Sequence, residues 1–251
     1  MLSVLKIGGS VLRDAESFEA AAAFIAARLA GHPEERLVVI VSAQYGMTDA
    51  LLTDAREIAT DPSEELLDLL WSTGEVRSVA VLALHLQRLG IKAEALNVHQ
   101  TGLIWTEGIA GVRPMRILAS LAHARVAIVP GFLAVQSGGG IRSLGRGGSD
   151  LTAVLLAAAL GAGRCELIKD VAGYYTADPH IRPDARPIHD LSLEDALAMA
   201  REGCDLVQPA ALEAAGRAAL PLTVRSLAAD APVTHVHHLD TVERVVRPGV
   251  A

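Results

Sequence analysis

The sequence predicts an α/β fold: a three-layer αβα sandwich around a central, mostly parallel open sheet. Short runs of β-branched and apolar residues alternate with longer helical stretches along the whole chain. Most of the short runs have no polar face, as expected for parallel strands that helices cover on both sides. The chain has 251 residues, of which 51% are hydrophobic and 20% charged, so it can bury a substantial core and is not disordered.

The predicted strands are the buried apolar runs, and the predicted helices are the longer stretches between and after them. The strands are expected at residues 2–7, 37–43, 93–98, 126–134, 165–171 and 222–227. The helices are expected at residues 15–29, 49–59, 63–70, 76–89, 114–122, 151–160 and 193–202. Because no repeat, linker or sharp change in composition divides the chain, we expect one domain over residues 1–251 with two lobes at most.

Charge and cysteine content exclude several classes of partner. Twenty-two basic and 29 acidic residues give a formal net charge of −7, which disfavours general binding to nucleic acid or to an anionic membrane. The longest apolar run, 151–163, is too short to span a bilayer, and Lys6 interrupts the apolar stretch that a signal peptide needs. Cys165 and Cys204 lack partners at disulfide or zinc spacing, which favours free thiols. We expect a cytoplasmic protein.

In an open parallel sheet, ligands bind beyond the carboxyl ends of the strands, and unusual residues follow several of the predicted strands. The first group is Lys6, Gly8, Gly9 and Ser10, between a strand and a helix. Adjacent glycines let backbone N–H groups approach an anion, and the following helix adds its positive end. The alternative is a glycine turn beside a solvated lysine.

The second group is the run 144–150, Leu-Gly-Arg-Gly-Gly-Ser-Asp, which leads into a predicted helix. Its glycines, Gly147 among them, leave the backbone free to wrap an anion, and Arg146 can pair bidentately with a carboxylate or phosphate. The run is not a Walker loop, because no Lys-Ser or Lys-Thr follows the glycines. The alternative for Ser149 and Asp150 is that they cap the helix.

The third group, residues 72–75, reads Ser-Thr-Gly-Glu before an apolar helix. Ser72 and Glu75 match a capping box, in which each side chain satisfies a backbone donor of the other. A carboxylate at this place can equally accept a substrate ammonium group.

The fourth group lies in residues 169–179, after the fifth predicted strand. Asp170, Tyr175 and Asp178 are suited to a nucleotide base, a ribose or a metal ion, and the alternative is a Gly/Pro turn with solvated acids. Segments 41–49 and 97–102 also follow strands and present small hydroxyl and amide groups.

His235, His237 and His238 could suggest a metal site, and His235 and His237 would share one face of a strand. No acidic or cysteine partner lies at ligand spacing, so we expect a surface strand there and no metal site.

Taken in order, these segments resemble the amino acid kinase family, and within it the catalytic domain of aspartate kinases. The run 144–150 is the most specific match, and the resemblance extends from residue 6 to about 226. The matching segments are residues 6–10, 41–43 with Gly46 and 48–49, 72–75, 131–132, 144–150, 170–171 with Gly173 and 175–179, and 221–222 with 224–226.

The resemblance implies that ATP donates its γ-phosphoryl group to the side-chain carboxylate of L-aspartate, giving an acyl phosphate, with Mg²⁺ carried mainly by the phosphates. Such a carboxylate is already ionised at neutral pH, so positioning and charge neutralisation replace a general base. The implied catalytic residues are Lys6, Gly8, Gly9 and Asp150. The implied acceptor-binding residues are Ser42, Thr48, Glu75, Arg146, Gly147 and Ser149. The implied ATP-binding residues are Lys6, Gly8, Ser10, Lys169, Asp170, Tyr175, Asp178 and Arg186.

The chain departs from the family pattern at Ile7, at Gln44 and Tyr45, at His99 beside the acceptor region, and at Lys169, where a change in adenine contacts is expected. These departures leave open a kinase for another small amino acid, carboxylate or phosphonate, and a non-catalytic nucleotide- or anion-binding subunit.

The resemblance also implies an acceptor-binding lobe at about residues 1–140 and an ATP-binding lobe at about 141–251. The family's regulatory domains have no counterpart in the sequence, so we expect a stand-alone catalytic domain that is either unregulated or served by a separate regulatory chain. A homodimer is expected.

Overall fold

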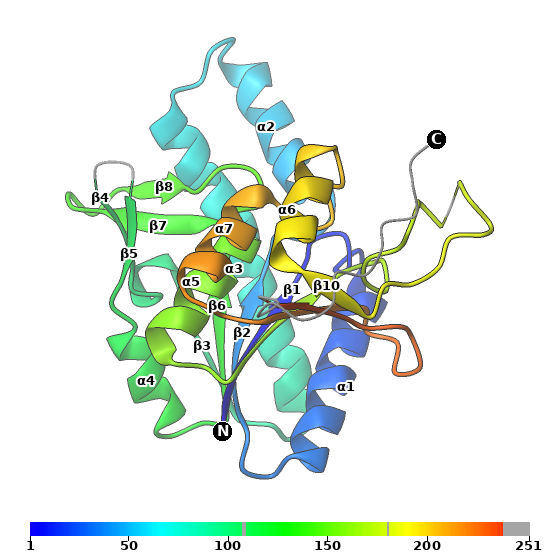
Figure 1. Cartoon of the computed structure of the whole chain (residues 1–251). Coiled ribbons are helices and arrows are strands. Elements are labelled where there is room, and N and C mark those ends of the chain that lie inside the picture. The colour runs from blue at the N-terminus through cyan, green and yellow to red at the C-terminus, as the bar shows by residue number, and fades with distance from the viewer. Residues whose placement is uncertain (107–108, 180, 238–251) are drawn as a thin grey trace.

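The computed structural model describes residues 1–106, 109–179 and 181–237, and these residues form two sheets (Figure 1). The strands of the larger sheet lie in the order β10 (Asp190–Ser192), β12 (Thr234–His237), β11 (Leu222–Arg225), β9 (Arg164–Ile168), β1 (Leu2–Ile7), β2 (Arg36–Val41), β6 (Val126–Pro130) and β3 (Ala93–Ala95). The strands of the smaller sheet lie in the order β5 (Ile109–Val112), β4 (Leu103–Thr106), β7 (Leu133–Gln136) and β8 (Ile141–Ser143).

The larger sheet is mostly parallel, as predicted. Strand β1 lies inside it and pairs in parallel with β2 and β9, with Lys6 in register with Ile40 on one side and Leu167 on the other. Strand β12 is antiparallel to β11 and parallel to β10. The carboxyl ends of β1, β2, β6 and β9 therefore meet at one edge of the sheet.

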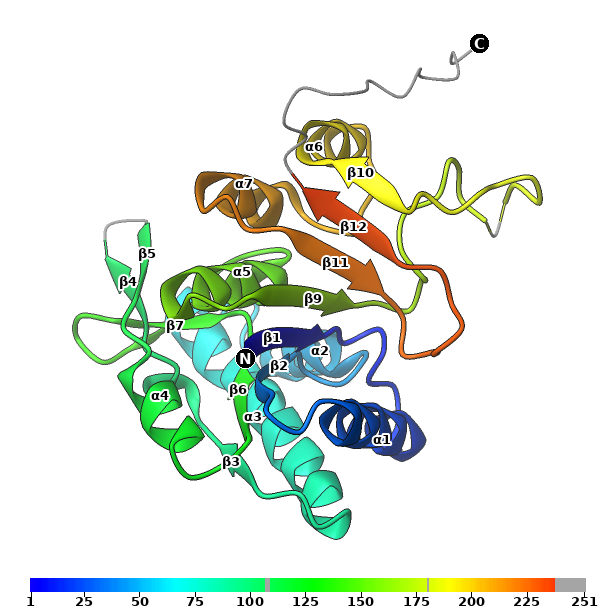
Figure 2. The same cartoon turned by 60° about the horizontal axis from the view of Figure 1, so that its bottom comes forward.

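Helices cover both faces of the larger sheet, which confirms the three-layer arrangement. The described helices are α1 (Ala15–Gly31), α2 (Met47–Ile58), α3 (Glu64–Arg88), α4 (Met115–Leu121), α5 (Gly148–Leu160), α6 (Leu193–Arg201) and α7 (Pro209–Arg217), with a 3₁₀ turn at Val98–Gln100. Figure 2 shows α1 and α3 on one side of the sheet and α5, α6 and α7 on the other. No described helix has both the length and the apolar character needed to cross a membrane.

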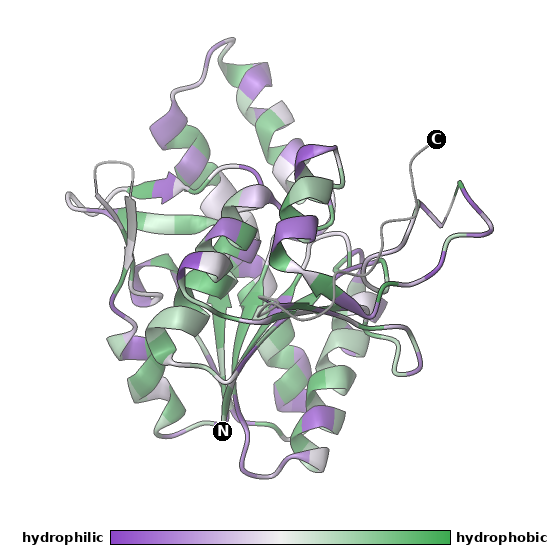
Figure 3. Cartoon of the chain, viewed as in Figure 1, coloured by the Kyte–Doolittle hydropathy of each residue, from purple (hydrophilic) through white to green (hydrophobic). Residues whose placement is uncertain are grey.

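The core consists of two apolar clusters that the sheet separates. In β2, Val38 and Ile40 belong to the cluster under α5 and α7, while Leu37, Val39 and Val41 belong to the cluster under α1 and α3. Every one of these side chains is buried, so β2 has no polar face over residues 37–41, and the central strands are mostly apolar in Figure 3. This burial on both faces is why the strand shows no in–out alternation in the sequence.

The predicted break between helices at residues 70–76 is wrong, because α3 runs unbroken from Glu64 to Arg88. Ser72 is inside the helix and its hydroxyl donates to the carbonyl of Leu69 at 2.6 Å, so the capping box with Glu75 does not exist. Gly74 is accommodated in mid-helix because a Cβ there would lie only 3.0 Å from Met47 Cγ. Close packing against α2 therefore outweighs the low helix propensity of glycine.

The predicted strand at 126–134 is two strands in two different sheets. The chain turns at Phe132, which has a φ of +70°, and passes from β6 in the larger sheet to β7 in the smaller one. The Phe132 amide donates to Thr152 Oγ1 at 3.1 Å, and its carbonyl accepts from the Leu144 amide at 2.7 Å. Its ring lies 6.0 Å from that of Trp71. Tertiary contacts thus hold a backbone conformation that a phenylalanine rarely adopts.

Helix α5 begins at Gly148 rather than at residue 151, and Gly147, with a φ of +70°, is its N-cap. Ser149 and Asp150 therefore lie in the first turn and do not cap the helix. The sequence prediction also missed α7 and the short strands β4, β5, β8 and β10, which have three or four residues each. A strand at His235 and His237 is confirmed as β12.

Candidate active site

The centre of the site is a cluster of three buried charged side chains, Lys6, Asp150 and Lys169, hereafter the Lys–Asp–Lys cluster. Lys6 Nζ lies 2.8 Å from Asp150 Oδ1, and Lys169 Nζ lies 2.6 Å from Asp150 Oδ2. Lys6 comes from the end of β1, Lys169 directly follows the neighbouring strand β9, and Asp150 comes from the first turn of α5. Lys6 is only 6% exposed, so the alternative of a solvated lysine is wrong.

The charges in this cluster stabilise one another against burial. Burial disfavours the Asp150 carboxylate, but the two lysines outweigh it and hold the pKa of Asp150 below its ordinary value. Burial and the nearby charge of Lys6 lower the pKa of Lys169, although Asp150 partly offsets them. The cluster is thus a pair of ammonium groups on one carboxylate, with an excess of one positive charge when all three are ionised.

A tight glycine turn adjoins the cluster, as the sequence predicts. The Gly8 amide donates to the carbonyl of Ile168 at 3.2 Å, which brings the turn against the end of β9. A Cβ on Gly9 would lie 2.7 Å from the carbonyl oxygen of Ala43, and a Cβ on Gly8 would lie 3.3 Å from Lys6 Nζ. Only glycine at residue 9 allows the backbone to pass this closely beside the end of β2.

Glu75 lies in the middle of α3 and is 4% exposed. Burial raises its pKa to about 8, while the backbone amides of Ala43 and Gly131 and the charge of Lys6 oppose that rise. Within the described residues, Glu75 Oε2 has no hydrogen-bond partner. A buried carboxyl oxygen without a partner is costly, and a ligand with a positive donor would satisfy it.

Ser42 and Thr48 lie between these features. Ser42 directly follows β2, its amide donates to the carbonyl of Ile7 at 3.2 Å, and its Cβ faces Gly9. Thr48 is in the first turn of α2, which begins after Gly46 in the left-handed conformation. Both residues are partly exposed at the edge of the sheet that carries Lys6.

The run 144–150 approaches the site through its C-terminal half only. Gly147 packs against Gln208, and a Cβ there would lie 2.2 Å from Gln208 Cγ. Ser149 is 8% exposed and faces Gly131 at the end of β6. Arg146 is exposed and, in the part of the chain that the structure describes, forms no ion pair. The structure therefore places Ser149 and Asp150 inside the site and Arg146 at its surface.

The predicted ATP-side residues fall into two groups. Ser10 Oγ donates to Asp170 Oδ1 at 3.0 Å, which places both beside the glycine turn. Tyr175 pairs with Pro187, and the amide of Thr176 donates to the carbonyl of Arg186 at 2.9 Å, so Tyr175 and Arg186 belong to one folded extension beyond β9. Asp178 lies in a turn of the same extension and is exposed.

Sequence reasoning missed a set of contacts around Arg13, next to the glycine turn. Arg13 lies 3.7 Å from Asp170 Oδ2 and 5.1 Å from the centre of the Tyr45 ring. Gln44 donates to the Arg13 carbonyl at 2.8 Å and accepts from Arg77 at 2.7 Å. Gln44 and Tyr45, the two residues that differ from the family pattern here, thus both contact Arg13. No local sequence pattern distinguishes these arginines from solvated ones.

Other predicted features lie away from this centre. His99 is exposed in the 3₁₀ turn before β4. His235 lies near Thr223 on the neighbouring strand, with 3.4 Å between its Nδ1 and the hydroxyl oxygen. Across residues 1–106, 109–179 and 181–237, no group of three or more His, Cys, Asp or Glu side chains is arranged to hold a metal ion. Cys165 is buried, Cys204 is partly exposed, and both are free.

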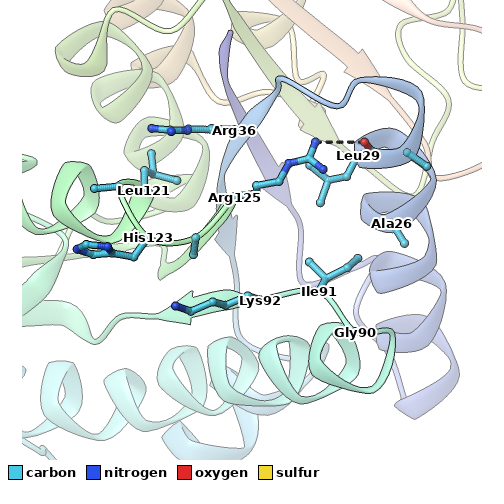
Figure 4. A pocket seen from close by; sticks show the side chains of 12 residues that line it. Ala26, Leu29, Arg36, Gly90, Ile91, Lys92, Leu121, His123 and Arg125 are labelled. Atoms are coloured by element: carbon cyan, nitrogen blue, oxygen red, sulfur yellow. Dashed lines mark hydrogen bonds between the residues drawn. The ribbon is translucent and has the colours of Figure 1, made fainter.

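A cavity of about 490 Å³ opens at the opposite edge of the sheet, at the amino ends of β2, β3 and β6 (Figure 4). Arg36, Lys92, His123 and Arg125 line it. Arg125 donates to the carbonyl of Leu29 at 3.1 Å, so its guanidinium is already engaged by the end of α1. The Lys–Asp–Lys cluster is at the carboxyl edge, where ligands of open parallel sheets bind, and this cavity is not part of that site.

The sequence profile of the amino acid kinase family matches residues 1–226. This chain belongs to the amino acid kinase family. The chain is 41% identical over 233 residues to the aspartokinase of Thermus thermophilus, covering 90% of this chain and 56% of that protein. It therefore spans about half the length of this relative.

The fold of this chain is also similar to solved structures of aspartate kinases. Aspartate kinase from Synechocystis has a TM-score of 0.85 at 38% identity, covering 95% of this chain and 40% of that one. Aspartokinase III of E. coli, in complex with aspartate and ADP, has a TM-score of 0.83 at 26% identity, covering 95% of this chain and 65% of that one.

Proposed function

We propose that this chain transfers the γ-phosphoryl group of ATP to the side-chain carboxylate of L-aspartate. The observation that carries the proposal is the Lys–Asp–Lys cluster beside the Gly8/Gly9 turn, with buried Glu75 nearby. The Lys–Asp–Lys cluster and the glycine turn are suited to binding a phosphoryl group. Glu75 is suited to binding an ammonium group on the acceptor. The names of the relatives and the aspartate and ADP bound to the E. coli enzyme support the same substrates.

The reaction requires no general base. An oxygen of the aspartate side-chain carboxylate forms a bond to the γ-phosphorus while the bond to the β,γ-bridging oxygen breaks, and that oxygen leaves on ADP with the electron pair. Charge on the transferring group is the main obstacle. Lys6 and the amide of Gly9 would stabilise it, as donors in an oxyanion hole do, and Asp150 would hold Lys6 in place. The Gly8 amide already donates to the carbonyl of Ile168, so Gly8 would contribute by letting the backbone turn beside Lys6.

The acceptor would be held from the side of α2 and α3. Glu75 would pair with its ammonium group, and Arg146 would close over its α-carboxylate from the surface. The remaining acceptor-side residues in this proposal are Ser42, Thr48, Gly147 and Ser149.

ATP would lie on the side of β9 and the extension beyond it. The residues proposed for this side are Ser10, Lys169, Asp170, Tyr175, Asp178 and Arg186. By the resemblance, residues 1–140 would form most of the acceptor-binding lobe and residues from about 141 onward most of the ATP-binding lobe. Ser10 on the ATP side, and Arg146, Gly147 and Ser149 on the acceptor side, would cross that boundary.

Mg²⁺ fits this site only as a companion of ATP. Within the described residues no cluster of three ligating side chains is present, and Asp170 already pairs with Ser10 and Arg13. Mg²⁺ binds readily through phosphate oxygens and water with few carboxylates. When bound, the ion would neutralise phosphate charge, and the protein would supply Lys6 and the Gly9 amide to the same group.

A homodimer is part of the proposal. Four large apolar side chains are exposed at the helices that flank the β3 edge of the sheet on its two faces (Figure 2): Leu84 on α3, Leu89 directly after α3, and Met115 and Leu118 on α4. Exposed apolar groups on either side of an open strand edge are suited to a second copy of the chain. Light scattering of the purified protein measures the mass directly.

A coupled assay of ADP release tests the proposed activity. The acceptors would be L-aspartate, other small amino acids, dicarboxylates without an amino group, and small phosphonates. We expect release that depends on aspartate and yields a product that hydroxylamine converts to a hydroxamate, as an acyl phosphate requires. Greater release with another acceptor would identify a kinase of different specificity, and nucleotide binding without release would identify a binding subunit.

A further inference from the structure

Lys169 occupies a position that the ATP-side assignment does not explain. It directly follows β9, and its backbone amide donates to the carbonyl of Arg225 at 2.8 Å, which fixes where its side chain begins. Its side chain is 11% exposed and extends to Asp150, where Nζ lies 2.6 Å from Oδ2. Lys6 takes the other oxygen of the same carboxylate at 2.8 Å. Lys169 therefore extends into the Lys–Asp–Lys cluster next to the glycine turn.

We propose that Lys169 is a second catalytic cation, which acts with Lys6 on the transferring phosphoryl group and does not contact adenine. The inference rests on the proposed phosphoryl transfer and adds a residue to it.

The charge balance of the cluster supports this role. One lysine suffices to neutralise Asp150, so the second adds a positive charge that no carboxylate within the cluster compensates. Glu75 is largely protonated at pH 7 because its pKa is about 8. Asp170 also pairs with Ser10 and Arg13, and it favours the charge of Lys169 less than Asp150 does. Burying an extra ammonium group is unfavourable unless an anion arrives to pair with it. A phosphoryl group is such an anion.

The hydrogen-bonding capacity of the cluster points the same way. An ammonium group has three N–H donors. Lys169 Nζ donates one to Asp150 Oδ2 at 2.6 Å, and Lys6 Nζ forms an ion pair with Asp150 Oδ1 at 2.8 Å. Further donors remain on each ammonium group for the oxygens of a phosphoryl group. As the γ-phosphorus moves from the bridging oxygen of ADP to the carboxylate oxygen, Lys6 and Lys169 would stabilise the charge on the group in transit, and no proton is transferred.

The test compares Lys169→Met and Lys169→Gln with wild type, and uses Lys92→Met as the matched control. Lys92 is an exposed lysine at the opposite edge of the sheet. We expect kcat to fall about 10²- to 10³-fold in both Lys169 variants, as for loss of an oxyanion-hole donor. The preference for ATP over GTP in kcat/KM should stay within about twofold of wild type, and the control should retain full activity. In these variants Asp150 still forms its ion pair with Lys6, so both proteins should fold.

Three results would overturn the inference. A kcat within a few-fold of wild type, with a lower melting temperature, would make Lys169 a structural partner of Asp150. Loss of the preference for ATP over GTP in the Lys169 variants would show that Lys169 contacts adenine. If wild type releases no ADP with any acceptor, the proposed function fails. Titration of wild type and Lys169→Met with ATP and with adenosine then still tests whether Lys169 contacts the phosphates. We then expect ATP to bind Lys169→Met at least fivefold more weakly than wild type and adenosine to bind both equally, whereas equal binding of ATP would refute the contact.

Discussion

Replacing Glu75 by glutamine separates a substrate-binding role from a structural one. Glu75 is 4% exposed in the middle of α3, and one of its oxygens has no partner among the described residues. Glutamine has nearly the same shape and keeps an oxygen beside the backbone of Ala43 and Gly131. It cannot become negative, so it cannot form an ion pair with a substrate ammonium group.

The sign of the effect on stability follows from the pKa of Glu75, which burial raises from 4.5 to about 8. Ionisation is then less favourable in the folded than in the unfolded chain, so wild type loses stability as pH rises from about 4.5 to about 8. At about 1.4 kcal/mol per pH unit, the loss between pH 5 and pH 8 is of the order of 3 kcal/mol. Glu75→Gln removes this contribution, so it should melt no lower than wild type at pH 5 and higher at pH 8.

The effect on activity has the opposite sign. A charge-assisted hydrogen bond to a substrate ammonium contributes about 1.5–3 kcal/mol, so kcat/KM for aspartate should fall roughly 10- to 150-fold in Glu75→Gln. Only about a tenth of Glu75 is ionised at pH 7, so the KM of wild type for aspartate should fall several-fold between pH 7 and pH 9. The variant should lack this trend.

The assay is ADP release with aspartate and with succinate, which lacks the amino group, together with thermal melts at pH 5 and pH 8. Glu65→Gln is the matched control, because Glu65 is an exposed glutamate of the same helix. Succinate should be a poor substrate for wild type, and the Glu75 variant should use it about equally well. Full activity of Glu75→Gln on aspartate would refute the ammonium contact and leave the amino-acid acceptor without support.

Three further substitutions test the remaining parts of the site. Lys6→Ala should lower kcat roughly 10²- to 10³-fold with a modest change in KM, and full kcat would remove Lys6 from the reaction. Arg146→Lys replaces a planar fork by a point charge, so the acceptor KM should rise while ATP affinity by titration stays near wild type; the reverse would move Arg146 to the nucleotide side. Gly9→Ala places a Cβ 2.7 Å from the Ala43 carbonyl, so it should shift the turn, lower kcat and lower the melting temperature, and wild-type values for both would contradict the close approach.

The sequence by itself determined the fold class and pointed to several residues of the candidate site. Buried strands such as β2 are continuous apolar runs because helices cover both of their faces, and this pattern is visible without coordinates. The glycine turn after Lys6 and the glycine run before α5 were equally visible, because close backbone approach and anion binding favour glycine locally, although α5 begins at Gly148 and not at residue 151. Roles at these positions remain predictions until the substitutions are measured.

Only the tertiary structure decided what depends on packing between distant segments. The run 72–75 carries the local pattern of a helix start, yet it lies inside α3 because Gly74 fits closely against α2. Phe132 splits one apolar run into strands of two sheets because Thr152 and Leu144 hold its backbone. Local propensity differs by about 1 kcal/mol per residue, and such contacts readily outweigh it.

The position of Lys169 is the clearest case. In the sequence it is a lysine beside a presumed nucleotide segment, and nothing local relates it to Asp150. The two meet because β9 lies beside β1 in parallel, and because α5 packs over both strands and presents its first turn to their carboxyl ends. Strand order and register are properties of the assembled sheet, so the second lysine of the cluster could be found only in the folded chain.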